Sequence, residues 1–180
     1  NPDGAELYTR VNYNKVDLNR DAYLLTQPES KCLRKAYDLV KPDYCFNLHD
    51  QRTIFSVAQT SQPATISFLA PAYNQERSIN DVRQQAMRLI VLMNKTLQEI
   101  IPNQIARFDD SFNINCTGDR YTQLGTPTIL FEAGHSPNDY NREQTTKHIA
   151  TALFTALQAI ALDMVTKVNF QEYFNIPEND

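Results

Sequence analysis

The spacing of apolar residues along the chain predicts alternating helices and strands. A helix is predicted from about Pro28 to Val40, because apolar residues recur there at helical spacing behind a capping residue and a first-turn proline. A strand is predicted over 44–48, where large apolar residues alternate with other types, and His49 stands where that strand stops. A second strand is predicted over Ala64–Leu69, which is rich in β-branched and aromatic residues.

Two longer amphipathic segments predict further helices. Ser78 begins a capping-box-like sequence, and one apolar face then runs from Val82 to Ile100, before Pro102 ends the helix. A final amphipathic helix is marked by apolar residues from Ile149 to Met164. The first of these helices is expected to pack on a sheet.

A short apolar run from Thr128 to Phe131 is typical of a strand buried on both faces, and Glu132 lies just past its end. Strands that alternate with helices predict an α/β fold with a mostly parallel or mixed central sheet flanked by helices, in one domain over residues 1–180. Functional groups in such folds collect at the carboxyl ends of strands, where both His49 and Glu132 are expected.

Two segments lack a sustained period. Asn1-Pro-Asp-Gly4 has the chemistry of a turn, and a chain seldom starts in one, so we expect an N-terminal part to precede it. Residues 103–126 contain Gly118 and Gly125 and are predicted to form a long ordered loop. Long loops inside compact domains usually serve a function.

Composition narrows the possible classes of protein. The chain of 180 residues is 42% hydrophobic and 21% charged, which fits one globular domain. Its net charge of -4 and scattered basic residues argue against nucleic-acid binding, and no apolar stretch reaches the ~18 residues of a membrane span. Cys32, Cys45 and Cys116 are widely spaced, so reduced thiols are expected. Reduced thiols favour a cytoplasmic location, and a periplasmic or secreted one stays open as the alternative. The oligomeric state is not indicated.

Glu132 and His49 are the first candidates for chemistry. Glu132 emerges from an apolar strand, where desolvation would favour the neutral form and bring its base strength into a useful range. The other interpretation is a structural acid paired with an arginine. His49 is a candidate metal ligand or general base, or a histidine that is only hydrogen-bonded.

Arginines supply the second set of candidates. Asn19 beside Arg20 would form a natural clamp for a carboxylate, through a bidentate fork and an amide donor. Arg10 is a candidate for stabilising a developing oxyanion. By residue type alone, four more arginines are equally eligible: Arg52, Arg77, Arg107 and Arg120.

Other polar residues are weaker candidates. His135 follows Gly134 and would support the Glu132 site only indirectly, whereas His148 belongs to the start of the last helix and is expected to be solvated. Asp109-Asp110 resembles a carboxylate pair but is more typical of a turn. Any of several tyrosines would suit a pocket wall: Tyr8, Tyr13, Tyr73, Tyr121 and Tyr140.

Taken in order, these motifs resemble the C-terminal two-thirds of a zinc metallocarboxypeptidase of the funnelin type. The resemblance runs from residue 1 to about 134, and each motif alone is modest. The matching segments are Asn1-Pro-Asp-Gly4, Arg10-x-Asn12, Val16-Asp-Leu-Asn-Arg20, Gln27-Pro-Glu29, Leu48-His49-Asp50 and Phe131-Glu132.

The resemblance implies a role for each site residue. His49 matches the family's third zinc ligand, and Glu132 matches the general base that deprotonates a metal-bound water. Arg10 matches the arginine that polarises the scissile carbonyl. Asn19 and Arg20 match the pair that binds the terminal carboxylate of the substrate. The resemblance also implies a zinc cofactor and a three-layer α/β hydrolase fold.

The chain departs from the family pattern. The family's first two zinc ligands form a His-x-x-Glu motif, which does not occur in these residues, and a catalytic zinc needs three protein ligands. We therefore expect a fragment without activity of its own. Asp21 replaces the usual asparagine, and the family's pocket tyrosine has no assigned counterpart. Asp119 and Arg120 would bias side-chain preference in opposite directions.

Three functions remain open. The first is a zinc-dependent carboxypeptidase that removes a C-terminal residue from a peptide. The second is an amidohydrolase that acts on N-acyl amino acids or murein peptides through the same carboxylate clamp. The third is a non-catalytic module that binds a carboxylate.

Overall fold

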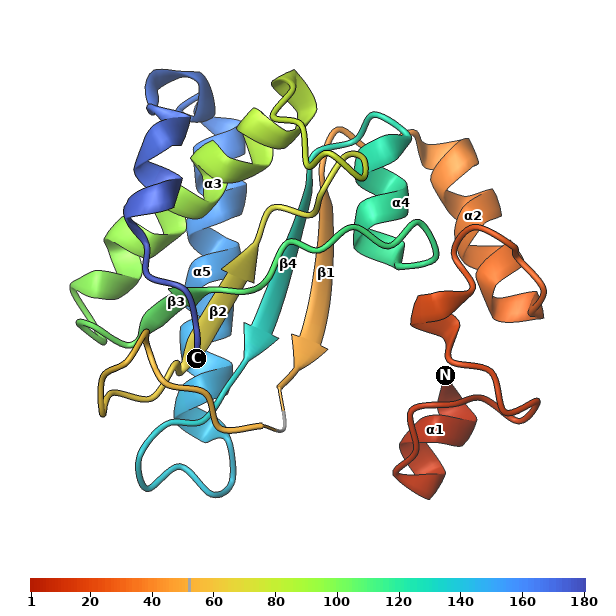
Figure 1. The fold of residues 1–180 in the computed structure, drawn as a ribbon, viewed down its shortest axis with the longest axis horizontal. Helices are drawn as coiled ribbons and strands as arrows, with labels where there is room; N and C mark the ends of the chain where they lie inside the picture. The colour runs from red at the N-terminus through yellow and green to blue at the C-terminus, as the bar shows by residue number, and fades with distance from the viewer. Residues whose placement is uncertain (52) are drawn as a thin grey trace.

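The computed structural model describes residues 1–51 and 53–180, which form an α/β fold around a four-stranded sheet (Figure 1). The strand order is β1-β4-β2-β3. β1 pairs with β4 in parallel, β2 pairs with β3 in parallel, and β2 and β4 are antiparallel, so the sheet is mixed and mostly parallel, which confirms the predicted fold class. The strands are β1 (Cys45–Asp50), β2 (Ile66–Leu69), β3 (Ile105–Arg107) and β4 (Thr128–Ala133).

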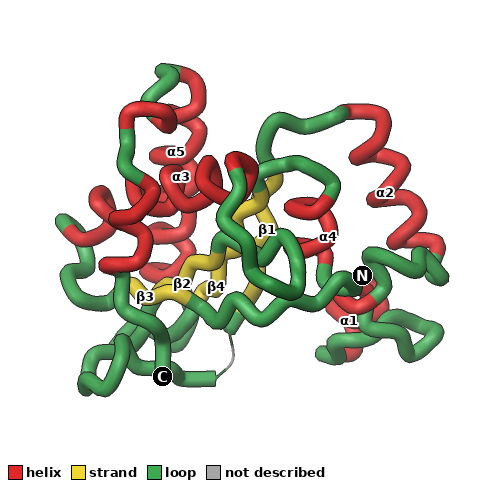
Figure 2. The backbone as a smooth tube through the Cα atoms, turned by 45° about the horizontal axis from the view of Figure 1, so that its top comes forward, coloured by secondary structure: helices red, strands yellow, loops and turns green. Residues whose placement is uncertain are grey.

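Two long helices cover one face of the sheet and form the main core with it. α3 (Asp81–Gln98) and α5 (Glu143–Ala161) pack against each other and against β4 (Figures 1 and 2). The ring of Phe131 meets that of Phe68 edge-on, with centroids 5.1 Å apart, and both side chains are fully buried. Burying each such side chain stabilises the fold by roughly 1.5–3 kcal/mol. No helix in the described part of the chain is long and apolar enough to cross a membrane.

The opposite face carries α4 (Thr117–Gln123), which packs on β1 and β4. α2 (Pro28–Val40) lies outside α4, and the rings of Tyr37 and Tyr121 stack at 4.6 Å between the two helices (Figure 2). The remaining elements are the N-terminal helix and three short 3-10 helices. They are α1 (Pro2–Leu7), η1 (Leu18–Arg20), η2 (Val165–Lys167) and η3 (Phe170–Asn175).

One predicted helix has the bounds that the sequence indicated, and another has different bounds. The helix predicted over 28–40 has those bounds. The helix expected to begin at Ser78 is instead capped by Asn80, whose side chain accepts a hydrogen bond from the Arg83 backbone N–H, and it ends at Gln98.

The irregular segments contain more regular structure than their sequence indicated. Asn1 to Gly4 is not a free turn, because the Asn1 side chain accepts from the Gly4 N–H and begins α1. The segment predicted as a loop over 103–126 contains β3 and α4. Both elements are short, and β3 has three residues, too few to show a period.

Candidate functional site

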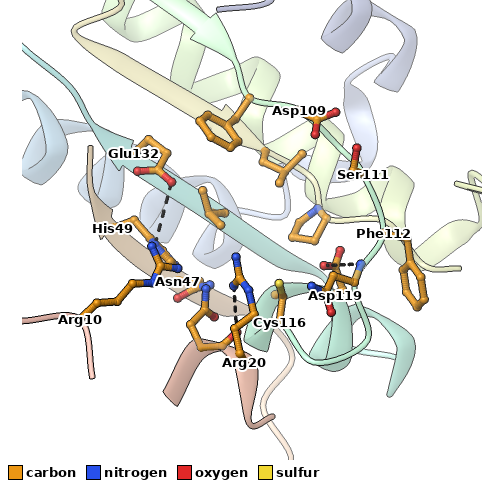
Figure 3. A pocket seen from close by; sticks show the side chains of 17 residues that line it. Arg10, Arg20, Asn47, His49, Asp109, Ser111, Phe112, Cys116, Asp119 and Glu132 are labelled. Carbon is orange, nitrogen blue, oxygen red and sulfur yellow. Dashed lines mark hydrogen bonds and ion pairs between the residues drawn. The ribbon is translucent and has the colours of Figure 1, made fainter. Parts of the chain in front are cut away.

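One cavity of about 440 Å³ is lined by all five residues to which the resemblance assigned a role. Its floor is the face of the sheet opposite α3 and α5, and its walls come from η1, α4 and the segment 108–113 (Figure 3). The nominated residues that line it are Arg10, Asn19, Arg20, His49 and Glu132.

The register of β1 and β4 brings His49 and Glu132 together. The two residues are directly opposite each other in the parallel pair, and His49 Nδ1 lies 4.0 Å from Glu132 Oε1. Side chains alternate along a strand, so Asn47 and Leu130 lie one row further along the same face, and both line the cavity. His49 and Glu132 lie inside their strands, not beyond the ends as predicted.

Burial sets the protonation of both groups. Desolvation raises the pKa of Glu132 to about 7, Asp50 adds to that rise, and Arg10 opposes it. Desolvation also lowers the pKa of His49, and the positive charges of Arg10 and Arg20 lower it further. Near neutral pH the cavity therefore holds a neutral imidazole beside a carboxyl that readily exchanges a proton.

Arg10 lies at the mouth of the cavity and is held by an ion pair. Its Nε donates to Asp17 Oδ2 at 2.6 Å, and its side chain is 63% exposed. Asp17 also caps η1, because its Oδ1 accepts from the Asn19 N–H. One carboxylate therefore sets the position of Arg10 and of the turn that carries Asn19 and Arg20.

The Asn19 side chain has a defined orientation. Its Oδ1 accepts from the backbone N–H of Thr117, at the first residue of α4, at 3.1 Å. The Nδ2 group is therefore left as a donor. Arg20 is exposed, and its Nη1 donates to the Asn19 carbonyl oxygen at 3.1 Å. Together they present an amide donor and a guanidinium at one side of the cavity.

Sequence reasoning missed part of the wall. Asn47 lies two residues before His49 on β1, so the strand period would have placed it on the same face. Asp119 is buried in α4, and desolvation raises its pKa to about 6, although backbone N–H groups of Asn113 and Ala72 lower it. No sequence signal separated Asp119 from its neighbour Arg120.

Asp110 anchors the wall segment 108–113 to the rest of the fold. Its carboxylate pairs with buried Arg83 and, at 3.1 Å, with Arg77. Burial alone would raise the pKa of Asp110, but these two guanidinium groups hold it below its ordinary value. The expected pair Asp109-Asp110 is therefore divided, since Asp109 lines the cavity and Asp110 faces α3.

The other candidates have different environments. Arg107 pairs with Glu178 at 3.1 Å, and Arg120 lies over the Tyr23 ring at 5.0 Å. Arg52 lies outside the described residues. His148 is on α5, and Tyr121 is buried against Tyr37. Of the described residues that line the cavity, none is His135, His148 or a tyrosine.

The potential metal ligands in the described residues do not by themselves form a catalytic zinc site. A zinc of that kind takes three protein ligands and keeps one position open. Among residues 1–51 and 53–180, no group of three or more His, Cys, Asp or Glu side chains is arranged to hold a metal ion. His49 is thus one potential ligand without companions in this part of the chain.

No protein-family model matches the chain, and no curated protein matches it.

Proposed function

We propose that the cavity is the substrate site of a carboxypeptidase-type hydrolase, which cleaves the amide bond before a C-terminal residue. The observation that carries the proposal is that one cavity contains both a carboxylate clamp and a carboxyl group of raised pKa. The resemblance of the ordered motifs to zinc metallocarboxypeptidases supports the same interpretation.

The clamp side would bind the terminal carboxylate of the substrate. Arg20 offers a planar fork of N–H donors, and Asn19 Nδ2 is left free by the bond from Thr117 to its Oδ1. A guanidinium and a carboxylate form charge-assisted hydrogen bonds that are about twice as strong as neutral ones. A C-terminal amide carries no charge and would bind more weakly.

The hydrolytic side would transfer a proton. With a pKa of about 7, Glu132 takes a proton from the attacking water as the oxygen bonds to the carbonyl carbon. Arg10 stabilises the negative charge that develops on the carbonyl oxygen. Glu132 then returns the proton to the leaving nitrogen as the C–N bond breaks, so the carboxylate is regenerated.

Zinc belongs to the proposal only as a cofactor with further ligands. When bound near His49, it would lower the pKa of a coordinated water and polarise the carbonyl. His49 is the residue of this chain that would contribute a ligand, and its lowered pKa favours the neutral, metal-binding imidazole. The remaining ligands would come from outside the described residues.

Calorimetry on the 180-residue chain tests the clamp without any metal. An N-acyl amino acid with a free carboxylate is expected to bind about tenfold or more tightly than its C-terminal amide. Arg20→Ala should remove that difference, whereas Arg34→Ala, on α2 outside the cavity where it pairs with Asp38, should not. Equal binding of acid and amide would remove the basis of the proposal.

The reaction itself is tested with the longest polypeptide that the gene encodes, supplied with zinc. Release of free amino acids from unblocked peptides is the expected result. If only N-acyl amino acids or murein peptides are cleaved, the site belongs to an amidohydrolase instead. If the clamp binds carboxylates and no substrate is cleaved, the module is a binding one.

A further inference from the structure

A second cavity, of about 520 Å³, lies at the β3 edge of the sheet, away from the candidate site. Four segments surround it: the loop 57–62, the C-terminal half of α3, the start of β3 and the segment 175–177 at the end of η3 (Figure 1). No described residue lines both this cavity and the candidate site. A ligand bound here would therefore occupy a separate site.

Side-chain amides form much of the wall of this second cavity, which we call the amide cavity. Of the described residues that line it, none carries a charge. A side-chain amide offers both hydrogen-bond donors and acceptors. A charged ligand would find no counterion in this wall, whereas a neutral ligand with donors and acceptors would find partners for both. The amides belong to Gln62, Asn94, Gln98, Asn103 and Asn175.

Hydrogen bonds fix the orientation of the two amides on α3. The backbone N–H of Asn103 donates to Gln98 Oε1 at 2.9 Å, and Gln98 Nε2 donates to Asn94 Oδ1 at 3.1 Å. Because Asn94 and Gln98 are four residues apart, they lie on the same face of the helix. The Nδ2 group of Asn94 is therefore presented as a donor.

The other walls are also held by hydrogen bonds within the protein. Thr60 Oγ1 donates to the Val57 carbonyl oxygen at 2.7 Å and accepts from the Gln62 N–H at 3.2 Å. On the opposite side, Arg107 Nε donates to the Ile176 carbonyl oxygen at 2.7 Å. A wall that is already ordered reduces the entropy lost when a ligand binds.

A peptide strand is a poor match for this cavity, because the outer edge of β3 is already paired. The Arg107 N–H donates to the Pro177 carbonyl oxygen at 2.6 Å, and the Asn179 N–H donates to the Arg107 carbonyl oxygen at 2.9 Å. Ile105, the β3 residue that lines the cavity, is fully buried. Addition of a strand needs an exposed edge with free backbone groups. A ligand would therefore meet the side-chain amides and not the strand.

A saccharide has the chemistry that this wall would recognise. Each hydroxyl group both donates and accepts hydrogen bonds, and a neutral sugar carries no charge. Ala58 and Pro177 line the cavity beside the amides and would contact the C–H face of a sugar ring. The volume lies within the range of about 300–1,000 Å³ that is usual for small-molecule sites. We propose that the amide cavity binds a neutral saccharide, independently of the proposed hydrolase function.

Binding of disaccharides to the 180-residue chain tests the inference. The probes are N,N′-diacetylchitobiose, cellobiose and maltose, and at least one should bind with a Kd of about 1 mM or below. In an NMR titration, the side-chain NH2 signals of Asn94 and Gln98 should shift, whereas the imidazole signals of His49 should not. Absence of binding by all three probes, or shifts confined to His49, would overturn the inference.

Variants of single amides identify the groups that bind. Asn94→Leu removes an amide and keeps a side chain of similar size, so it should weaken binding about tenfold, the range of one hydrogen bond. Asn175→Ala, at an exposed position in a different wall, should also weaken it. Gln158→Leu is the matched control, because it replaces an exposed amide on α5 outside the cavity and should leave the Kd unchanged. Equal effects of Asn94→Leu and Gln158→Leu would contradict the inference.

Two further ligands separate a saccharide from a peptide and a free sugar from a polymer. Tighter binding of acetyl-glycyl-glycine methylamide than of every disaccharide would overturn the assignment to saccharides. Sedimentation with insoluble chitin or cellulose that Asn94→Leu abolishes would identify a glycan polymer as the source, whereas binding of a disaccharide alone would identify a free sugar. Either result supports the amide cavity as a saccharide site. Failure of this inference leaves the carboxylate clamp untouched, since the two cavities share no described residue.

Discussion

His49 and Glu132 occupy one register position of the parallel β1–β4 pair, with 4.0 Å between His49 Nδ1 and Glu132 Oε1. That distance exceeds a hydrogen bond, so neither group neutralises the other. Desolvation by burial raises the pKa of the Glu132 carboxyl to about 7, Asp50 adds to the rise, and Arg10 offsets only part of it. The burial of the Glu132 carboxyl therefore underlies both its proposed role as a base and a measurable cost to the stability of the fold.

The first prediction concerns that cost. The pKa of Glu132 is raised from 4.5 to about 7 on folding, so its contribution to stability is present below pH 4.5 and is lost as the pH rises through 7. Glu132→Gln should therefore be nearly neutral at pH 4 and should stabilise the chain by up to about 3 kcal/mol at pH 8. Urea unfolding at the two pH values measures the difference. A variant that is equally destabilised at both would show that Glu132 is structurally paired.

The second prediction separates the base from the ligand. In the longest polypeptide that the gene encodes, Glu132→Gln should retain the zinc content and lower kcat by about 100-fold or more, because the base is lost. His49→Ala should lower the zinc content itself. Metal analysis and peptide hydrolysis on the same preparations provide both measurements. Near-normal turnover in Glu132→Gln would mean that another group is the base.

The hydrophobic pattern of the strands determined how much of this site could be predicted from the sequence. The alternation along β1 and the apolar run of β4 indicated where His49 and Glu132 emerge, and the parallel pairing of these two strands brings the residues together. A mostly parallel or mixed sheet was predicted, but not which strand is antiparallel, since strand direction depends on the path of the connections and not on the local pattern. Local patterns therefore predicted the α/β class and the kind of sheet, but not the strand order β1-β4-β2-β3.

The short elements of the cavity wall could not be predicted from the sequence and were identified only in the structure. α4 has seven residues, and its cap, Cys116, makes no side-chain hydrogen bond, so no capping signal marks its start. The direction in which Asp119 and Arg120 point depends on the packing of α4 against β1 and β4. The role of Asp110 likewise depends on Arg83, 27 residues away in the sequence.

The third prediction tests the anchor of the wall segment. Asp110→Ala would leave the guanidinium of Arg83, whose side chain is 2% exposed, without its carboxylate. Arg83 would keep its bonds to the carbonyl oxygens of Ala70 and Arg77, so we expect a loss of about 2–3 kcal/mol, less than for a fully unpaired buried charge. Unfolding in guanidinium chloride measures this loss of stability. Arg77→Ala, with a side chain that is 56% exposed, should cost less than about 1 kcal/mol.

A rescue experiment shows whether the Asp110 effect comes from the stranded charge. The double variant Arg83→Met with Asp110→Ala removes both charges and keeps an apolar side chain in the buried space. It should be more stable than Asp110→Ala alone, because replacing both members of a buried pair is less costly than removing one. If the two losses simply add, the ion pair is not what holds segment 108–113.

The last prediction concerns the end of β4, where backbone proximity leaves no room for a side chain. A Cβ on Gly134 would lie 2.1 Å from the carbonyl oxygen of Ala64, and this backbone atom cannot rotate away. Gly134→Ala should therefore shift the end of β4 and cost about 3 kcal/mol. At Gly118 the nearest atom is Pro71 Cγ at 3.0 Å, so Gly118→Ala should cost about 1 kcal/mol. Thermal unfolding compares the two, and since Glu132 lies two residues from Gly134, only Gly134→Ala should also alter the pH dependence of stability. Equal costs would mean that the close approach to Ala64 relaxes without moving the strand.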